Sequence, residues 1–204
     1  MKKIIWLFMG IGFISCSDKK AKTIETTPVS DTIAETILIK TTDKKQLIVP
    51  GKSIGLTHLG QNAETLAALG RPDFSDAAMG KAWSTWYSKD DKKNELNIYT
   101  TYKNSEMTEK VIRLIRITSP EFKTEDGIST GSSINTIRNS YPKLVLCGKY
   151  KDAEGTVEIY DDVDLGIAFE IRKENCISII VHETGKKVID EYITFHPDME
   201  RFEV

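Results

Sequence analysis

The sequence predicts an α+β fold made of two tandem units, each a short helix packed on an antiparallel β-meander. The tandem arrangement is predicted by two segments with the same layout, in which Gly60 and Gly131 each precede a short helical pattern that ends at a proline. Each segment is followed by runs of β-branched and aromatic residues separated by short polar stretches, which is typical of antiparallel strands. The first unit is expected to span residues 36–120, and the second, with a C-terminal extension, residues 121–204.

Residues 1–15 predict a signal peptide. Lys2 and Lys3 supply a positive start, and the uncharged apolar run Ile4–Ile14 follows them. This run is too short to cross a membrane as a helix, which takes about 20 residues. It ends at Ser15 and Cys16, a small residue directly before a cysteine, and so resembles the lipobox of bacterial lipoproteins.

The lipobox resemblance implies cleavage before Cys16, a diacylglyceryl thioether on its sulfur, and a further acyl chain, such as palmitate, on the new amino terminus. Several acyl chains anchor a protein stably, since each buried methylene contributes about 0.8 kcal/mol. Ser17 follows the cysteine, and by the sorting rule of Gram-negative lipoproteins a residue other than Asp there implies the outer membrane. The resemblance therefore implies an outer-membrane lipid anchor facing the periplasm. The alternatives are an ordinary signal peptide with a coincidental cysteine, or an uncleaved anchor.

Residues 16–35 predict a lipidated N-terminus followed by a flexible tether. The stretch is rich in Thr, Ser and charged residues and poor in apolar ones. Such a composition cannot bury enough surface to offset the entropy lost on ordering. A flexible chain of this length gives the folded part a reach of about 20–25 Å.

Capping residues and β-rich runs define the elements expected in each unit. Gln61 or Asn62 is the expected N-cap of the first helix, and Ser132 or Ser133 that of the second. An additional strand at Gln46–Val49 is expected to lead into the first unit. The strands expected after the two helices are Trp83–Tyr87, Leu96–Tyr102, Val111–Ile117, Thr156–Tyr160, Gly166–Ile171 and Cys176–Val181.

The arrangement resembles tandem repeats of the BamE-like and beta-lactamase-inhibitor-protein-like fold over roughly residues 47–183. The motifs that carry the resemblance are Gly55 and Gly60 before Leu69-Gly70-Arg71-Pro72, and Gly127 and Gly131 before Tyr141-Pro142. These motifs mark turns and caps and bring no catalytic residue with them. The resemblance implies a binding role, such as scaffolding an envelope complex or inhibiting an enzyme.

Composition and motifs argue against several classes of function. The chain has 28 basic and 30 acidic residues, a formal net charge of −2, whereas nucleic-acid binders normally carry a basic excess. The three histidines lie far apart, and no H-E-x-x-H, G-x-S-x-G or Walker pattern is present. The acidic stretch 161–164 lacks the register of a calcium loop and is interpreted as a solvated turn. We therefore expect no enzyme activity, no cofactor and no metal site.

Cys147 and Cys176 remain once Cys16 carries lipid. Two cysteines in an extracytoplasmic compartment can form a disulfide, and a closed loop of this size would contribute about 3 kcal/mol. The alternative is a pair of buried thiols that pack as small apolar side chains. The sequence leaves both possibilities open.

Strand alternation predicts a mixed aromatic and polar sheet face as the binding surface. In the second unit it assigns Val157, Ile159, Phe169 and Ile179 to a face packed under the helix. The opposite face combines aromatic side chains and arginine with polar residues, a composition typical of protein-binding patches. The candidate binding residues are Trp86, Tyr99, Tyr160, Glu170, Arg172 and His182. An alternative for the tryptophans is that they fill the core.

Together these features predict a non-catalytic, lipid-anchored envelope lipoprotein that acts as a protein-binding, scaffolding or inhibitory module. Its expected partners are the membrane, through the lipid, and an envelope protein. One alternative is a periplasmic module that binds a small ligand in a cleft between the two repeats. Another is a hydrolase with a site assembled from scattered residues such as His182, Glu170 and Arg172.

Overall fold

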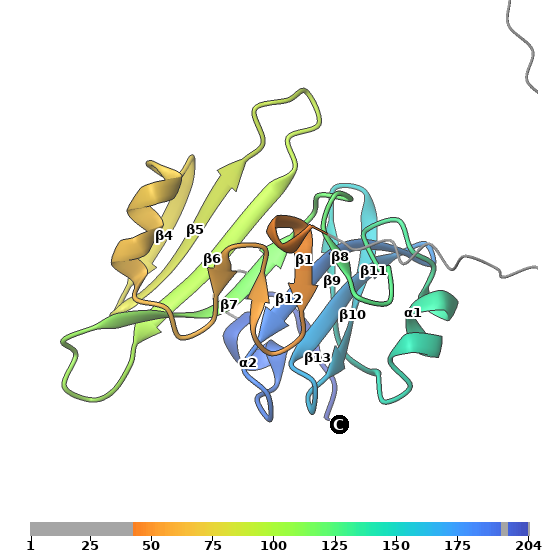
Figure 1. The fold of residues 1–204 in the computed structure, drawn as a ribbon. Helices are drawn as coiled ribbons and strands as arrows, with labels where there is room; N and C mark the ends of the chain where they lie inside the picture. The colour runs from red at the N-terminus through yellow and green to blue at the C-terminus, as the bar shows by residue number, and fades with distance from the viewer. Residues whose placement is uncertain (1–42, 193–195, 204) are drawn as a thin grey trace, which may run out of the picture. The chain divides into compact units, whose positions relative to one another are not determined.

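A continuous nine-stranded sheet, antiparallel at every pairing, forms the centre of the fold (Figure 1). The computed structural model describes residues 43–192 and 196–203. The spatial order of the strands is β13 (Glu200–Arg201), β9 (Val145–Asp152), β10 (Gly155–Asp162), β11 (Ile167–Arg172), β12 (Asn175–His182), β7 (Lys110–Ile117), β6 (Glu95–Tyr102), β5 (Lys81–Tyr87) and β4 (Phe74–Ala78). The predicted signal peptide, Cys16 and the tether lie outside the described residues.

A small second sheet and four short helices complete the described structure. The small sheet has the order β3 (Thr57–His58), β2 (Ser53–Ile54), β1 (Leu47–Val49) and β8 (Lys123–Thr124), with β1 and β8 parallel. The helices are η1 (Lys44–Gln46), η2 (Ala63–Leu69), α1 (Ile134–Ser140) and α2 (Val188–Tyr192), of which η1 and η2 are 3₁₀ helices. Among the described residues, no helix is long and apolar enough to cross a membrane.

The predicted fold class, two tandem units of a helix on a meander, is wrong. The chain is mostly β, and its two runs of strands, β4–β7 and β9–β12, join into one sheet because β7 pairs with β12. Ile117 lies opposite Ile179 at one end of this pairing, and Leu114 lies opposite His182 at the other. Both strands are buried on both faces, as central strands are. The meanders therefore cannot be separate units, each covered by its own helix.

The helices begin where the sequence predicts, but they are too small to form a layer. The side chain of Asn62 caps η2 by accepting a hydrogen bond from the Glu64 N–H, and Ser133 caps α1 in the same way with Thr136. η2 buries none of its residues fully. α1 buries Ile134 and Ile137. Most of the cover of the large sheet comes from elsewhere.

One face of the large sheet packs against the small sheet and α1. Apolar side chains from central strands, including Ile98, Ile115, Phe169 and Ile179, form a continuous buried cluster with the residues that cover them. The cover is supplied by Ile48 and Ile54 from the small sheet, Ile128 from the loop after β8, and Ile134, Ile137 and Tyr141 from α1 and its end. This core spans both runs of strands.

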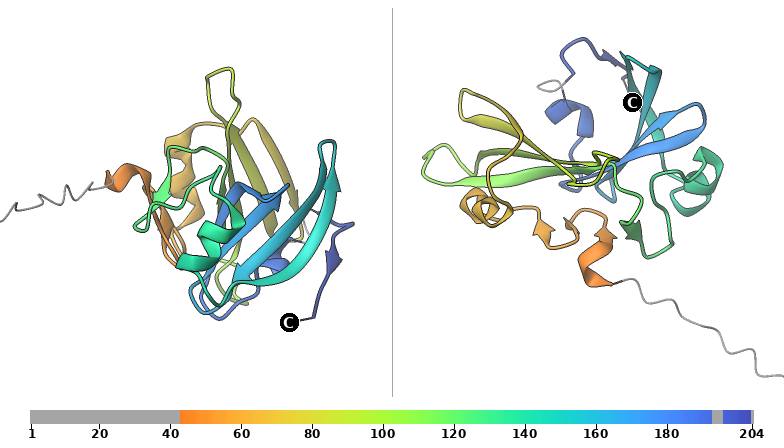
Figure 2. Two further views of the ribbon diagram at one scale, coloured as in Figure 1. Left: turned by 90° about the vertical axis from the view of Figure 1, so that its right-hand side faces the viewer. Right: turned by 90° about the horizontal axis from the view of Figure 1, so that it is seen from above.

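The opposite face of the large sheet packs against α2 and the C-terminal segment 196–203. Figure 2 shows α2 and this segment on the side of the sheet that is remote from η2 and β1. Val188 and Ile189 of α2 and Met199 of the segment pack with sheet residues that include Trp83, Leu114, Ile159 and Ile180. The sheet is therefore buried on both faces, which explains why its central strands carry few purely exposed positions.

Because the two runs of strands share one sheet, they should unfold together. A chain of residues 16–204 with Cys16→Ser has tryptophans only at 83 and 86, in β5, and thiols only at 147 and 176, in β9 and β12. We expect tryptophan fluorescence and thiol labelling to give the same urea midpoint. Two separate midpoints would show that the halves unfold independently.

Candidate functional site

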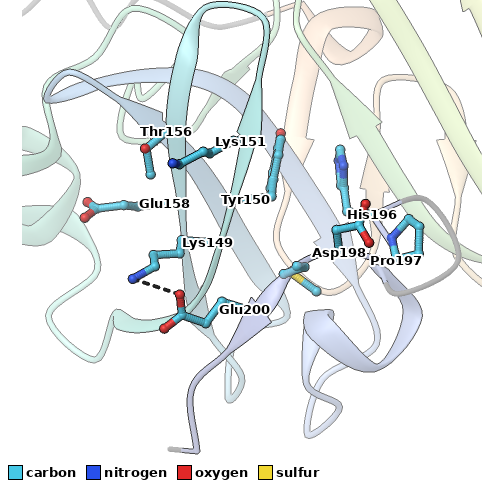
Figure 3. Close-up of a pocket in the computed structure, with 10 residues that line it drawn as sticks. Lys149, Tyr150, Lys151, Thr156, Glu158, His196, Pro197, Asp198 and Glu200 are labelled. Carbon is cyan, nitrogen blue, oxygen red and sulfur yellow. Dashed lines mark ion pairs between the residues drawn. The ribbon is translucent and has the colours of Figure 1, made fainter.

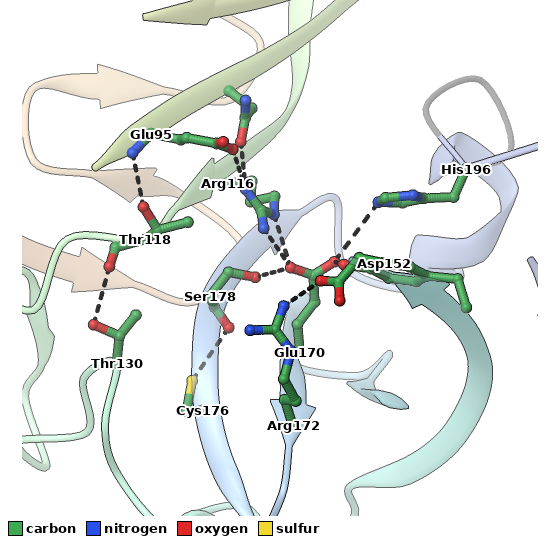
Figure 4. Close-up of polar contacts among 12 residues, drawn as sticks. Glu95, Arg116, Thr118, Thr130, Asp152, Glu170, Arg172, Cys176, Ser178 and His196 are labelled. Carbon is green, nitrogen blue, oxygen red and sulfur yellow. Dashed lines mark hydrogen bonds and ion pairs between the residues drawn. The ribbon is translucent and has the colours of Figure 1, made fainter. Parts of the chain in front are cut away.

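A row of buried polar side chains crosses the sheet face that lies under α2 and the C-terminal segment (Figure 4). At its centre, Arg116 of β7 forms an ion pair with Glu170 of β11, with Nη2 to Oε2 at 2.7 Å and Nε to Oε2 at 2.8 Å. Arg116 also donates to Glu95 Oε2 at 2.8 Å and to Asn97 Oδ1 at 2.7 Å. The side chain of Arg116 is 8% exposed and that of Glu170 is fully buried.

Glu170 stays ionised because its surroundings supply several donors. Tyr150 OH donates to Oε1 at 2.6 Å, and Ser178 Oγ donates to Oε2. Burial alone would raise the pKa of Glu170, but Arg116 and the hydrogen bonds from Ser178 and Tyr150 outweigh burial and hold this pKa below its usual value. The carboxylate is thus fully engaged by the protein itself.

A cavity of about 950 Å³ lies beside this network, between β9, β10 and the C-terminal segment (Figure 3). The Tyr150 ring stacks on the His196 ring, with centroids 3.7 Å apart and planes inclined by 16°. The wall of the cavity carries charges of both signs. It consists of Lys149, Tyr150, Lys151, Thr156, Glu158, His196, Pro197, Asp198, Met199 and Glu200. Burial lowers the pKa of His196 to about 4, although Glu170, 4.0 Å from Nε2, opposes the shift. The imidazole is therefore neutral at pH 7.

Burial also shifts the pKa values of two thiols and a tyrosine in this part of the sheet. Burial raises the pKa of the Cys147 thiol to about 12 and also raises that of Cys176, so neither is a thiolate at neutral pH. Burial, followed by the nearby Glu170 charge, raises the pKa of Tyr150 as well. Within the described part of the chain, no group of His, Cys, Asp and Glu side chains is placed to hold a metal ion.

The six candidate binding residues do not form one exposed face. Tyr99, Glu170 and His182 are fully buried, and Tyr160 nearly so. Trp86 packs against the core on the other face and donates from Nε1 to Gly70 O at 3.1 Å. Arg172 is half-buried and pairs with Asp152 and Glu154 in the β9–β10 hairpin.

The register between β10 and β11 explains much of the difference between the predicted and the observed sheet faces. Ile159 lies opposite Glu170, and Tyr160 lies opposite Phe169. Val157 and Ile159 therefore share a face with Glu170 instead of with Phe169, which corrects the predicted assignment. Alternation shows which residues of one strand share a face. The register between neighbouring strands, which decides which faces coincide, is set by loop length and bulges.

His182 belongs to a second buried pair, separate from the Arg116–Glu170 network. His182 Nε2 lies 2.9 Å from Asp161 Oδ1, and the other carboxylate oxygen accepts a hydrogen bond from Val188 N at 2.9 Å. Asp161 therefore ties the start of α2 to β10 and β12. The hydrolase alternative grouped His182 with Glu170 and Arg172, but each of these three side chains has its own partners.

Cys147 and Cys176 are free, buried thiols and not a disulfide. Cys147 lies in β9 and Cys176 in β12, and two strands separate them in the sheet. At about 4.8 Å per strand, they are roughly 14 Å apart across the sheet, beyond the roughly 7 Å that a disulfide spans. Each donates to a backbone carbonyl, Cys147 to Ile159 O at 3.3 Å and Cys176 to Ser178 O at 3.2 Å.

The longest strand of the large sheet with only exposed residues is its edge strand β4, which was not among the strands predicted from the sequence. All five of its residues are exposed, and the ring of Phe74 is among the large exposed apolar groups. A two-residue loop, Met79-Gly80, joins β4 to β5, and both residues have positive φ, as a type I′ turn requires. The segment FSDAA has weak β-propensity, so composition gives little signal for this strand.

Comparisons with protein-family models, with curated proteins and with solved structures found no match to this chain. The resemblance to bacterial lipoproteins accordingly stays a prediction, whereas the two tandem units that the BamE-like resemblance implied are contradicted by the single continuous sheet.

The buried ion pair should be costly to break. Glu170→Gln leaves Arg116 without its buried carboxylate, and we expect a loss of about 3–5 kcal/mol in the free energy of unfolding measured with urea. The double change Arg116→Met and Glu170→Met should cost less than the sum of the single changes. As a matched control on the same strand, Arg113→Met removes a half-exposed pair with Glu183 and should cost about 1 kcal/mol or less. Equal losses for the two pairs would contradict the interpretation.

His196 should make the fold sensitive to acid. Between pH 6.5 and about 4 the unfolded chain binds a proton at this histidine that the folded chain does not, so stability falls as pH decreases through this range. The loss is about 3 kcal/mol at 1.36 kcal/mol per pKa unit. His196→Phe keeps an aromatic ring against Tyr150. Its free energy of unfolding, measured with urea, should fall less between pH 7 and pH 4 than that of the wild type. His58→Phe, an exposed control, should behave as the wild type; if it alone flattens the pH dependence, the assignment to His196 is wrong.

Proposed function

We propose that this protein is a non-catalytic, lipid-anchored binding module of the bacterial envelope, and that it captures an extended segment of another protein along the outer edge of β4. The observation that carries the proposal is the exposure of β4. All five residues of this edge strand are exposed, and among the described strands it pairs only with β5. An uncovered edge presents free backbone donors and acceptors to another chain. Addition of a strand to such an edge is a recurrent mode of peptide recognition.

The register of the hairpin shows which backbone groups are available. Ala78 and Lys81 flank the two-residue loop and form a hydrogen-bonded pair, and Asp76 with Trp83 is the next pair of this type. The N–H and C=O groups of Ser75 and Ala77 therefore point away from β5. These four groups are the proposed docking points for a partner strand.

The composition of β4 supports a heterologous partner. The strand contains no proline or lysine and no bulge interrupts its pairing, so it lacks the usual features that block strand addition. Asp76 is its only charge and its central residue. Symmetric antiparallel pairing with a second copy would place the two Asp76 carboxylates opposite each other, which is unfavourable. The preferred partner is an extended segment with Lys or Arg opposite Asp76 and an apolar residue near Phe74.

The chemistry of the interior supports a binding role. Glu170 is occupied by Arg116, Ser178 and Tyr150, and His182 by Asp161. The buried thiols are protonated. A lipid on Cys16 and the tether that follows it would hold β4 within reach of other envelope proteins.

Ala77→Pro tests the proposal, because it removes an outward N–H while leaving the hydrogen bonds to β5 in place. A photo-crosslinking residue at position 75 in intact cells should capture one partner in the wild type. Ala77→Pro should reduce this product at least tenfold, while Ala77→Val, which keeps the N–H, should retain it. Urea unfolding controls for damage to the fold. No crosslinked partner in the wild type, or an undiminished one with Ala77→Pro, would refute the role of the edge.

A further inference from the structure

We infer that one end of the large sheet, formed by the β4–β5 turn and the β6–β7 loop, rests on a phospholipid bilayer, with Met79 and Met107 inserted among the lipids. Because β4, β5, β6 and β7 are neighbouring antiparallel strands, both connections lie at the same end of the sheet. The inference rests on the proposed function in one respect, namely that an anchor holds the chain near a membrane.

The two methionines are among the most exposed apolar side chains that the structure describes. Met79 is 99% exposed and Met107 is 65% exposed. The turn that contains Met79 carries no charge between Asp76 and Lys81, since the residues there are alanine, alanine, methionine and glycine. Single exposed apolar side chains are common on protein surfaces, but these two project from adjacent connections and can enter one apolar environment together.

Both methionines also have backbone conformations that favour other residue types. Met79 has a φ of 48° and Met107 a φ of 54°, in the left-handed region where Gly, Asn and Asp are preferred. The other non-glycine residues with positive φ in the described part of the chain are Lys93, Lys173 and Glu174, which are all charged. The chain therefore places a bulky apolar side chain at a strained position twice at one end of the sheet. Local conflicts of this kind are expected where function requires the residue.

Behind the two tips lie side chains that are typical of a membrane–water interface. Tyr102 ends β6, and its ring packs against the β4–β5 turn, because a Cβ atom on Gly80 would lie 2.7 Å from Tyr102 Cε2. Tyr102 also lines a shallow cavity together with Met107. Lys110, the first residue of β7, holds its ammonium group 5.2 Å from the centre of the Tyr102 ring. Tyrosine and lysine commonly lie at the level of the lipid headgroups, with their polar ends in water.

The charges at this end of the sheet favour a zwitterionic lipid surface over a strongly charged partner. Lys103 and Glu109 form an ion pair at 3.2 Å. The lysines at this end are matched in number by acids, the full set being Lys81, Lys103, Lys110, Glu64, Glu106 and Glu109. Insertion of apolar side chains requires no net charge. Two projecting tips give a partner protein little area to cover, whereas a fluid lipid surface accommodates each tip separately.

The length of chain before the described residues allows this contact. Residues 17–42 span at most about 90 Å when extended, so an anchor at position 16 leaves the tips within reach of the bilayer. Two side chains bind lipid weakly in a freely diffusing protein, but a tether raises their effective concentration at the membrane. The contact would orient the strands away from the bilayer and present the outer edge of β4 to its side.

Quenching by nitroxide-labelled phosphatidylcholine tests the inference. The chain of residues 16–204 with Cys16→Ser is held on phosphatidylcholine vesicles by an N-terminal hexahistidine tag and a nickel-chelating lipid. A fluorescent NBD group is attached through Ser105→Cys in the β6–β7 loop or through Lys93→Cys in the β5–β6 hairpin, at the opposite end of the strands (Figure 1). The buried Cys147 and Cys176 stay unlabelled in the folded protein. Nitroxide should quench the group at position 105 at least threefold more than that at position 93.

Two sets of variants assign the quenching to the methionines. The double change Met79→Asn and Met107→Asn suits positive φ, so it should unfold in urea no earlier than the wild type, while quenching at position 105 falls to the level at position 93. Leu56→Asn makes the same kind of change at an exposed position of the small sheet and should leave quenching unchanged.

Three outcomes would overturn the inference. They are equal quenching at positions 105 and 93, undiminished quenching in the double asparagine variant, and an equal loss of quenching with Leu56→Asn. Because the tag supplies the anchor, none of these outcomes depends on lipidation of Cys16 or on the capture of a partner by β4.

Discussion

The pairing of β7 with β12 is the constraint on which the rest of the structure depends. It joins two runs of antiparallel strands, distant in sequence, into a single sheet with no interruption. A nine-stranded sheet has two broad apolar faces, and each must be covered to remove it from water. The small sheet with α1 covers one face, and α2 with the C-terminal segment covers the other. The same pairing brings Arg116 of β7 within reach of Glu170, two strands away.

The buried charge at the join is tolerated only because its partners come from several strands. An isolated carboxylate in a protein interior is strongly unfavourable. Here Arg116 supplies the opposite charge, and Ser178 and Tyr150 satisfy further lone pairs. Because these donors lie on β7, β12 and β9, the carboxylate is satisfied only when all of these strands are in register. The network therefore favours one alignment of the sheet, a specificity that apolar contacts alone provide less sharply.

Local features were predicted from sequence more successfully than nonlocal ones. The caps Asn62 and Ser133 depend on a few neighbouring residues, and both helices begin directly after them. The strands around Leu96–Tyr102 and Val111–Ile117 were also recognised, because their composition is strongly β-forming. Apolar residues on both faces of Val111–Ile117 were a sign of a central strand that the two-unit interpretation overlooked.

Nonlocal features account for most of the errors. The burial of Glu170 and His182 depends on α2 and the C-terminal segment, which periodicity did not resolve. The separation of Cys147 from Cys176 depends on strand order, which spacing along the chain does not reveal. β4 was missed because a weakly β-forming segment becomes a strand only through its pairing with β5. In each case the deciding contact lies far away in the sequence, or in another strand.

The two edges of the sheet are treated differently, and this asymmetry supports a binding role. At one edge, the chain returns to cover part of β9 with β13 and adds the Lys149–Glu200 ion pair and the stacked Tyr150 and His196. At the other edge, β4 ends the sheet with exposed residues and no comparable cover among the described elements. An uncovered edge is a liability for aggregation, so its retention without lysine or proline calls for a compensating use. The proposed capture of an extended partner would provide that use, because the partner itself would then complete the sheet.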